Sequence, residues 1–329
     1  METTTIFDPG EVPFDSCHAA TLTLTSPDSL LTAWFGGSAE GNDDVAIWAS
    51  RRCGSQWKKP LRVAKVSEEP HWNPVLFSAP DGTVHLFFKV GRKIPDWQTW
   101  IMSSTDGGRH WTDPKALVPG DAGGRGPVKN KPIVLADGCW LAPLSIRADP
   151  DEQTRRVNAY TDRTCDGGRT WQLSSPVGID HESFPGAGLI QPALWESTSG
   201  KVHMLMRSSC GRICRADSND GGQTWSQVTR TSLPNNNSGI DLDRMSDGTL
   251  ALVYNPVGED WGSRTPLRLS LSYDNGVTWP DSIDLVTGEG EFSYPSIIAR
   301  NGVLYVVYTW KRKAIAFWQG SPEHVREHE

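Results

Sequence analysis

The sequence has no long apolar run. No stretch of the 329-residue chain approaches the ~20 apolar residues that a membrane-spanning helix needs. Runs of Lys or Arg are also missing and the formal net charge is −7, so we expect neither nucleic acid nor a membrane surface as a partner. The N-terminus lacks the basic start and apolar core of a signal peptide, which predicts a cytoplasmic protein, although a secreted form trimmed of its signal would look the same.

Cysteine is sparse and scattered, with six residues in the chain. Only Cys210 and Cys214 lie close together in sequence, and no second pair completes a zinc-ligand pattern. We therefore expect reduced thiols, as in a cytoplasmic protein, and neither a metal nor a cofactor. The cysteines are Cys17, Cys53, Cys139, Cys165, Cys210 and Cys214.

Glycine (32 residues) and proline (23 residues) are plentiful, which suits many short strands joined by turns. The pattern Ser/Thr-x-Asp-x-Gly-x-x-Trp, which we call an Asp box, recurs every 54 to 60 residues, and a degraded copy at 50–57 has Arg52 in place of the aspartate. The aspartate can accept hydrogen bonds from its own turn, a glycine takes a positive φ and the tryptophan packs onto the sheet. The intact copies are Ser104–Trp111, Thr164–Trp171, Ser218–Trp225 and Ser272–Trp279.

Two further signals repeat with the boxes. Short apolar strands begin every 47 to 60 residues, and in five of the six units a second strand opens after a turn that contains glycine. Each unit therefore consists of strand A, a tight turn, strand B, a loop, strand C, the Asp-box turn and strand D. The strand-A starts are His18, Asn73, Lys131, Gln191, Asn237 or Ser238, and Tyr294.

Four antiparallel strands repeated six times predict an all-β fold, a six-bladed β-propeller that residues 1–329 form as a single domain. The last unit is one strand short, because no box follows 313–317. We expect the N-terminal segment near Thr4–Phe7 to supply this outer strand and close the ring. Almost no helix is expected.

Antiparallel geometry sorts the residues to the two ends of the propeller. The A–B turns and the Asp boxes share one end, so we interpret the box aspartates as structural. Strand-A starts, strand-B ends and the loops before strand C meet at the other end, where we expect the functional site. Besides the strand-A starts, this end collects Lys89, Arg207, Asn255, Glu40, Asp43, Asp44, Trp97, Arg156 and Arg264.

Several of these side chains also have a structural interpretation. Polar residues on a propeller axis, such as Asn73, often surround ordered water. Lys131 could pair with Glu182 or Glu196 to balance charge, and a lone histidine such as His18 is more often structural than catalytic.

Two arginines and a tyrosine point more directly to chemistry. Arg207 and Arg264 lie at the predicted pocket mouth, where two guanidinium groups form a bidentate site for a carboxylate. Tyr294 is a candidate nucleophile or proton donor if positive charge lowers its pKa.

The boxes and the propeller resemble the sialidase (neuraminidase) superfamily over the whole chain. Segments such as WNPVLF, KNKPI and SYPSII are similar to the group labelled predicted neuraminidases. This resemblance implies a substrate carboxylate held by three arginines, a tyrosine nucleophile assisted by a glutamate, and an aspartate as acid and base. By position, Arg207 and Arg264 match the second and third arginines, Tyr294 matches the nucleophile, and Asp43 or Asp44 is nearest to the acid/base aspartate.

Two positions depart from the family pattern. His18 stands where the resemblance implies the first arginine. Gln191 stands where it implies the glutamate, and an amide cannot take a proton from a phenol. The predicted site therefore keeps an anion-binding pair of arginines and a tyrosine, and it has a histidine that the family pattern lacks and amide side chains near the propeller axis.

We favour an exo-acting carbohydrate enzyme whose partner is a small acidic sugar or a glycan terminus. In its glycoside hydrolase form, Arg207 and Arg264 hold the carboxylate and Tyr294 attacks the anomeric carbon. Asp43 or Asp44 then protonates the leaving oxygen. The other residues expected to bind substrate are Asn73, Lys89, Lys131, Gln191 and Asn237.

Three alternatives remain open. In a metal-independent uronate lyase, Arg207 with Asn73 or Gln191 would neutralise the carboxylate, while His18 and Tyr294 would serve as base and acid. The pocket could instead isomerise or cyclise a non-carbohydrate metabolite. A non-catalytic glycan-binding propeller is the last alternative, and in every case we expect a monomer or a weak homodimer.

Overall fold

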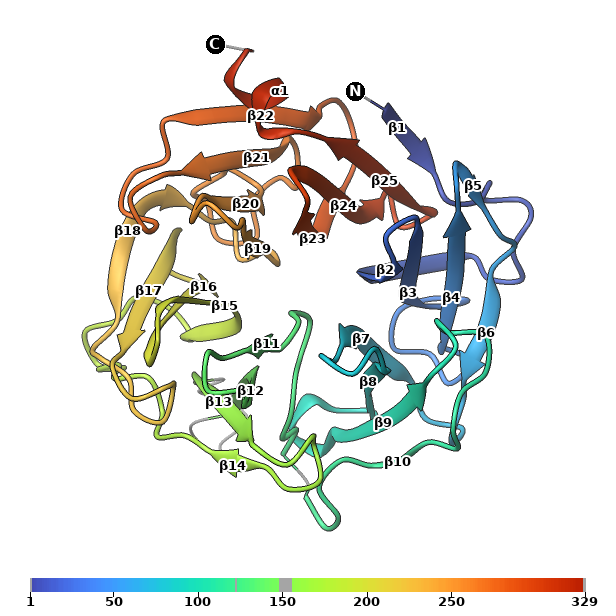
Figure 1. The fold of residues 1–329 in the computed structure, drawn as a ribbon, viewed down its shortest axis with the longest axis horizontal. Helices are drawn as coiled ribbons and strands as arrows, with labels where there is room; N and C mark the ends of the chain where they lie inside the picture. Colours follow the sequence, from blue (N-terminus) through green and yellow to red (C-terminus); the bar gives the residue numbers. More distant parts are fainter. Residues whose placement is uncertain (1, 122, 148–155, 328–329) are drawn as a thin grey trace.

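The fold is a closed ring of six antiparallel sheets, as Figure 1 shows. The computed structural model describes residues 2–121, 123–147 and 156–327. The prediction of a six-bladed propeller is confirmed, because the strands group into sheets in the order in which the repeats occur in the sequence.

Blades 1 to 3 are formed by the first half of the chain, and in each the innermost strand comes first. Blade 1 carries one extra strand, because β6 also pairs with β4. Their strands are β2 (Ser16–Ser26), β3 (Ser29–Gly37), β4 (Ala46–Cys53), β5 (Gln56–Trp57) and β6 (Leu61–Ala64); β7 (His71–Ser78), β8 (Val84–Val90), β9 (Gln98–Ser104) and β10 (Lys115–Ala116); and β11 (Ile133–Val134), β12 (Trp140–Arg147), β13 (Val157–Thr164) and β14 (Gln172–Leu173).

Blades 4 to 6 follow the same order. A short 3₁₀ helix, η1 (Ile94–Asp96), lies between β8 and β9 in blade 2, and α1 (Pro322–Arg326) follows the last strand. Within the described residues, no helix has the length and apolar character needed to cross a bilayer. The strands are β15 (Leu189–Thr198), β16 (Lys201–Ser208), β17 (Arg212–Ser218) and β18 (Thr229–Pro234); β19 (Asp241–Arg244), β20 (Leu250–Tyr254), β21 (Leu267–Ser272) and β22 (Asp281–Val286); and β23 (Phe292–Arg300), β24 (Val303–Trp310) and β25 (Ala314–Gly320).

The N-terminal strand closes the ring. β1 (Glu2–Thr5) pairs antiparallel with β25, so that Thr5 lies opposite Ala316, and the Ile6 amide continues the ladder to the Ile315 carbonyl at 2.9 Å. Blade 6 therefore takes its outermost strand from the opposite end of the chain. The predicted closure near Thr4–Phe7 is confirmed, and its strand begins two residues earlier than expected.

The Asp boxes are self-contained turns. In the second intact box the Asp166 carboxylate accepts hydrogen bonds from the amides of Arg169 and Thr170, both at 3.0 Å, and from the Thr164 hydroxyl at 2.8 Å. Two successive glycines, Gly167 and Gly168, take positive φ of 71° and 84°. The second oxygen, Oδ2, accepts from the Thr170 hydroxyl at 2.6 Å, so both oxygens of Asp166 hold their own turn, which agrees with a structural role for the boxes.

Each inner strand begins near a residue in the left-handed backbone region, with φ between 41° and 67°. In two blades this left-handed residue is not the predicted strand-A start. In blade 1 the left-handed residue is Ala19, one position after His18, and in blade 3 it is Lys129, two positions before Lys131. The six positions are Ala19, Asn73, Lys129, Gln191, Asn237 and Tyr294.

The expectation of six reduced thiols is wrong. Cys139 and Cys165 form a disulfide. They flank β12 and β13, where Trp140 lies opposite Thr164, so the antiparallel register brings their side chains together across the sheet. The other four cysteines are free.

Candidate active site

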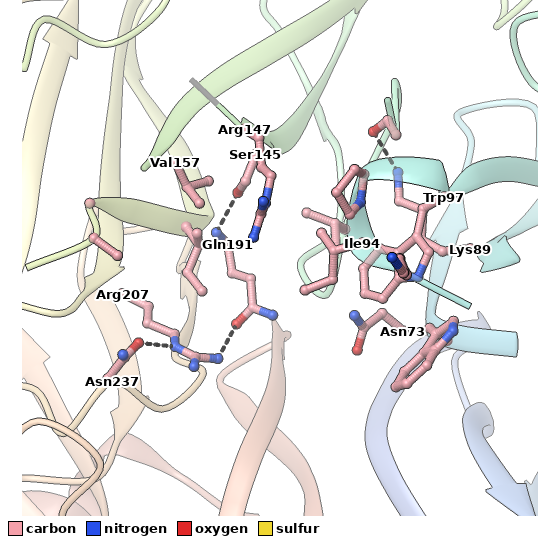
Figure 2. A pocket seen from close by; sticks show the side chains of 18 of the residues that line it. Asn73, Lys89, Ile94, Trp97, Ser145, Arg147, Val157, Gln191, Arg207 and Asn237 are labelled. Carbon is pink, nitrogen blue, oxygen red and sulfur yellow. Dashed lines mark hydrogen bonds between the residues drawn. The ribbon is translucent and has the colours of Figure 1, made fainter. Parts of the chain in front are cut away.

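A cavity of about 690 Å³ lies where the starts of inner strands meet the ends of second strands. This volume falls within the ~300–1,000 Å³ typical of small-ligand sites. Asn73, Gln191 and Tyr294 come from strand-A starts and Arg207 from a strand-B end, as the repeat predicts. Figure 2 shows Asn73 facing Arg207 and Gln191 across the cavity.

Arg207 forms the floor of the cavity. It is only 4% exposed, and Nε donates to the Asn237 side-chain oxygen at 2.8 Å. Nη1 donates to the side-chain oxygen of Gln191 at 3.1 Å and to the hydroxyl oxygen of Tyr294 at 2.6 Å. All three partners are uncharged groups, and no carboxylate among the described residues pairs with this guanidinium. Arg207 is thus a buried, uncompensated cation that lines the cavity.

The Tyr294 side chain lies between positive charges. The carbon centres of the Arg207 and Arg264 guanidiniums are 5.7 Å and 5.5 Å from the centroid of its ring. Burial raises the pKa of the phenol, but the positive charges of Arg207 and Arg264 and a hydrogen bond from the Gln191 side chain outweigh it. The pKa of Tyr294 is therefore lowered below its usual 10. Tyr294 therefore loses its proton at a lower pH than a tyrosine in water does.

His18 lies behind Tyr294 instead of facing the cavity. Its ring centroid is 4.1 Å from that of Tyr294, its Nδ1 is 2.9 Å from the Thr309 hydroxyl, and only 2% of the residue is exposed. Burial, followed by the charge of Arg312, holds the pKa of His18 well below 6.5. At neutral pH this histidine is uncharged and packs against the tyrosine.

Glu291 connects the arginines of the site. Its Oε1 accepts from Arg264 Nη1 at 2.6 Å, and its Oε2 accepts from Arg312 Nε at 2.9 Å. Arg264 does not line the cavity, so the structure does not bring it beside Arg207 as a free carboxylate ligand. The predicted pair of arginines at the pocket mouth is therefore corrected. Arg207 lines the cavity, whereas Arg264 is bound to Glu291.

Arg312 was not predicted from the sequence. It follows β24 in a turn where Lys311 and Arg312 both have positive φ. Its Nη2 is 3.5 Å from Nε2 of His18, and its Nη1 donates to Glu40. Arg312 of the sixth blade therefore reaches His18, the residue that stands where the family resemblance implies the first of three arginines. Nothing in the local sequence marks this turn, because the positive φ belongs to non-glycine residues.

The predicted acid/base aspartates lie outside the cavity. Asp43 forms a two-pronged ion pair with Arg92, and both Asp44 oxygens accept from Ser38, at 2.8 Å from the amide and 2.9 Å from the hydroxyl. Glu40, in the same loop, is the one carboxylate among the described residues that line the cavity.

Two predicted substrate-binding lysines have other partners. The buried Lys89 ammonium donates to Thr99 Oγ1 at 2.6 Å and to the carbonyls of Gly124, Arg125 and Gly126 at 2.7 to 3.2 Å, so it anchors a loop at the cavity wall. Lys131 pairs with Asp241 at 3.0 Å, and not with either of the glutamates considered from the sequence. Its role is to tie blade 3 to blade 5.

Aromatic and apolar side chains surround the polar floor. Trp72 and Trp97 lie with ring centroids 5.4 Å apart, and the guanidinium carbon of Arg207 lies 5.8 Å from the Trp261 ring. Trp261 is 69% exposed and Ile94 is 60% exposed, although both line the cavity. Such surfaces are suited to the apolar faces of sugar rings. Of these side chains, only Trp97 was predicted to lie at this end.

Comparison with known proteins agrees with this architecture. A sialidase of Micromonospora viridifaciens is 27% identical over 257 residues, which cover 68% of this chain and 36% of that protein. A sialidase of Bacteroides fragilis is 25% identical over 63% of this chain and 39% of its own length. The chain thus spans less than half of these curated relatives.

Solved structures show the same fold. The Hadza microbial sialidase Hz136 superposes with a TM-score of 0.81 at 18% identity, covering 98% of this chain and 69% of that one. A protein of unknown function from Dyadobacter fermentans has a TM-score of 0.77 at 17% identity and covers 97% of both chains. The BNR repeat-like domain model matches residues 28–306. The chain therefore belongs to the BNR repeat-like domain family of the sialidase superfamily.

Proposed function

We propose that this protein is a carbohydrate-active enzyme that binds the carboxylate of an acidic sugar through Arg207 and cleaves the adjoining glycosidic bond. The observation that carries the proposal is the Arg207 guanidinium, which is buried, lines the cavity and has only neutral partners among the described residues. A buried charge is costly unless it is paired, so a carboxylate in the cavity would complete the site. The curated relatives named sialidases support an acidic sugar as substrate.

Tyr294 is the proposed nucleophile of a retaining hydrolysis. Its oxygen attacks the anomeric carbon while the bond from that carbon to the leaving oxygen breaks, which forms a covalent aryl glycoside between the Tyr294 oxygen and the sugar. Water then attacks the same carbon and releases the tyrosine. With Gln191 at the position of the implied glutamate, the positive charges of Arg207 and Arg264 replace a general base in favouring the phenolate.

Glu40 is the proposed acid and base, in place of Asp43 and Asp44. It is the one carboxylate in the described cavity lining, whereas the two aspartates are held by Arg92 and Ser38. In the first step Glu40 gives a proton to the leaving oxygen, and in the second it removes one from the attacking water. Arg312, its ion-pair partner, holds the carboxylate at the cavity wall.

Elimination is the second candidate, and the neutral Gln191 beside Tyr294 favours it. In this reaction the Tyr294 phenolate would take the proton from the carbon next to the carboxylate, and the leaving oxygen would depart with a proton from Glu40. Arg207 would neutralise the carboxylate as negative charge develops. The buried, uncharged His18 would take no direct part.

The test is turnover of aryl glycosides of sialic, ulosonic and uronic acids, for hydrolysis, and of a panel of 1,4-linked uronate oligosaccharides, for elimination, by the native protein and by Tyr294→Phe. We expect roughly a hundredfold to ten-thousandfold loss of kcat in the variant with nearly unchanged substrate affinity. Tyr273→Phe is the matched control, because Tyr273 is exposed and bonds to Asp281 in an outer strand. Mass spectrometry separates the two reactions, since hydrolysis adds water to the products and elimination does not.

No turnover of any substrate in the panel, or full activity in Tyr294→Phe, would contradict the proposal.

A further inference from the structure

The cavity is lined by a second guanidinium, that of Arg147, in addition to the Arg207 guanidinium at its floor. Arg147 is the last residue of β12 in blade 3, and it is half-buried. Its Nη1 is enclosed and has no hydrogen-bond partner within the part of the chain that the structure describes. Figure 2 shows the side chain reaching into the space between Gln191 and Ile94. Because the Arg147 side chain lines the cavity and is not fully paired within the described structure, its guanidinium can receive an acceptor from a ligand.

Arg147 is connected to the floor of the cavity through Gln191. The backbone amide of Gln191 donates to the Ser145 hydroxyl at 2.8 Å, and the side-chain oxygen of Gln191 accepts from Arg207. Ser145 and Arg147 are two residues apart on one strand, so their side chains leave the same face of the sheet roughly 7 Å apart. The two guanidiniums therefore lie along one continuous wall that blades 3 and 4 form together.

The cavity is positively charged in a protein that is acidic overall. The described residues of its lining include five cationic side chains and one acidic side chain, Glu40, whereas the formal net charge of the chain is −7. The Lys89 ammonium is bound by the oxygens of Thr99 and a neighbouring loop, and Arg92 is paired with Asp43. The cationic residues are Lys89, Arg92, Lys93, Arg147 and Arg207.

A mixed surface faces Arg147 across the cavity. Ile94 and Pro95 of η1 and the neighbouring Trp97 line this wall and present apolar atoms to the cavity. The Asn73 side chain adds an amide that makes no hydrogen bond with any described residue and is 6% exposed. A sugar ring offers the complementary combination, an apolar face and polar edges, so a second sugar unit fits between these walls.

We propose that Arg147 forms a second anion subsite, and that the ligand is an acidic oligosaccharide with a negative group on each of two neighbouring sugar units. This inference rests on the proposed function in one respect, because it assumes that Arg207 holds the carboxylate of the first unit. The unit bound at Arg147 would carry a carboxylate or a sulfate, since a guanidinium binds either group by two parallel hydrogen bonds.

The test compares matched probes of one and two acidic units. N-acetylneuraminic acid and its α-2,8-linked dimer form one pair, and galacturonic acid and its α-1,4-linked dimer form the other. Binding is followed by titration calorimetry on the native protein, Arg147→Gln and Arg207→Gln. Arg169→Gln, an exposed arginine in an Asp-box turn at the opposite end of the blades, is the matched control for loss of one positive charge.

In the native protein we expect at least one dimer to bind about tenfold or more tightly than its monomer. Arg147→Gln should abolish this difference and leave the affinity for the monomer nearly unchanged. Arg207→Gln should weaken both probes. The melting temperature of Arg147→Gln should equal that of the native protein, because Arg147 Nη1 has no partner to lose within the described structure.

Dimers that bind no better than monomers, or an Arg147→Gln variant that keeps the preference for dimers, would overturn the second subsite and leave the proposed function standing. An Arg147-dependent preference for dimers together with an unchanged affinity in Arg207→Gln would overturn the carboxylate site at Arg207 and leave the subsite standing. If no probe binds, both proposals are wrong.

Discussion

At the scale of single residues, the ionisation of Tyr294 is the feature that most affects the proposed chemistry. A phenol in water is protonated throughout the physiological range, so it is a weak nucleophile. In this protein Arg207 donates to the Tyr294 oxygen at 2.6 Å, and the guanidinium carbon of Arg264 lies 5.5 Å from the centroid of the Tyr294 ring. Together the two arginines lower the pKa of Tyr294 against the opposing effect of burial. Because the reactive form is the deprotonated one, activity should rise with pH and level off below pH 10, the ordinary pKa of tyrosine.

Arg264→Gln tests this electrostatic account. Removing the cation raises the pKa of Tyr294, so the rise of kcat/KM with pH should move to higher pH. The control is Arg268→Gln, because Arg268 also forms an ion pair, with Asp284 at 2.7 Å, on β21 of the same blade. An unchanged pH profile in Arg264→Gln, or an equal shift in both variants, would contradict the role assigned to the arginine.

The residues of the site were predictable from the sequence only where the repeat determines their position. Gln191 and Tyr294 lie at strand-A starts and Arg207 lies at a strand-B end, positions that the repeat defines, and the structure brings them together. Glu40 and Arg312 come from irregular loops, where sequence spacing does not determine the direction of a side chain. Their ion pair is therefore visible only in three dimensions.

At the scale of elements, the Asp boxes stabilise the blades without contributing to the site. Asp220 accepts hydrogen bonds from the amides of Gln223 at 3.1 Å and Thr224 at 2.9 Å and from the Ser218 hydroxyl at 2.7 Å. In this respect the box resembles a helix N-cap, in which a carboxylate satisfies the free amides of a turn.

Asp220→Ala should therefore lower the free energy of unfolding by about 1 kcal/mol and leave kcat unchanged. Thermal denaturation would show this as a decrease of about 2 °C in melting temperature. Asp28→Ala is the control, because the Asp28 carboxylate makes no hydrogen bond in the described structure. A loss of activity that is larger than the loss of stability would contradict a purely structural role.

The strand pattern was predictable because box, turn and strand repeat together, and this agreement identified all six blades. The left-handed residue near the start of strand A was not predictable in every blade, since it is defined by backbone conformation and not by residue type. Lys131 precedes a proline, as Asn73 does, yet the left-handed residue of that blade is Lys129. The Cys139–Cys165 disulfide was also missed, because the pairing depends on the register of β12 and β13.

At the scale of the whole molecule, closure of the ring depends on β1. Its four residues pair with β25, and without them the outer edge of blade 6 would expose unpaired backbone groups. Blade 6 also supplies Tyr294 and Arg312, so the site depends on a blade that both ends of the chain complete.

Deletion of residues 2–5 should lower the free energy of unfolding by about 2–4 kcal/mol, at roughly 1 kcal/mol for each backbone hydrogen bond lost. Chemical denaturation measures this change, and increased aggregation should accompany it because the edge of β25 is exposed. A variant that ends at Glu327 is the control, since it keeps every described strand. An unfolding curve identical to that of the native protein would show that β1 contributes nothing to closure.

The central claim is that Arg207 holds the carboxylate of an acidic sugar beside Tyr294. A crystal structure of the native protein soaked with an acidic monosaccharide tests it most directly. We predict the carboxylate within about 3 Å of the Arg207 guanidinium, with the anomeric carbon facing the Tyr294 oxygen at about 3–3.5 Å. A sugar bound in the cavity with its carboxylate directed away from Arg207, or bound only elsewhere on the propeller, would contradict the account.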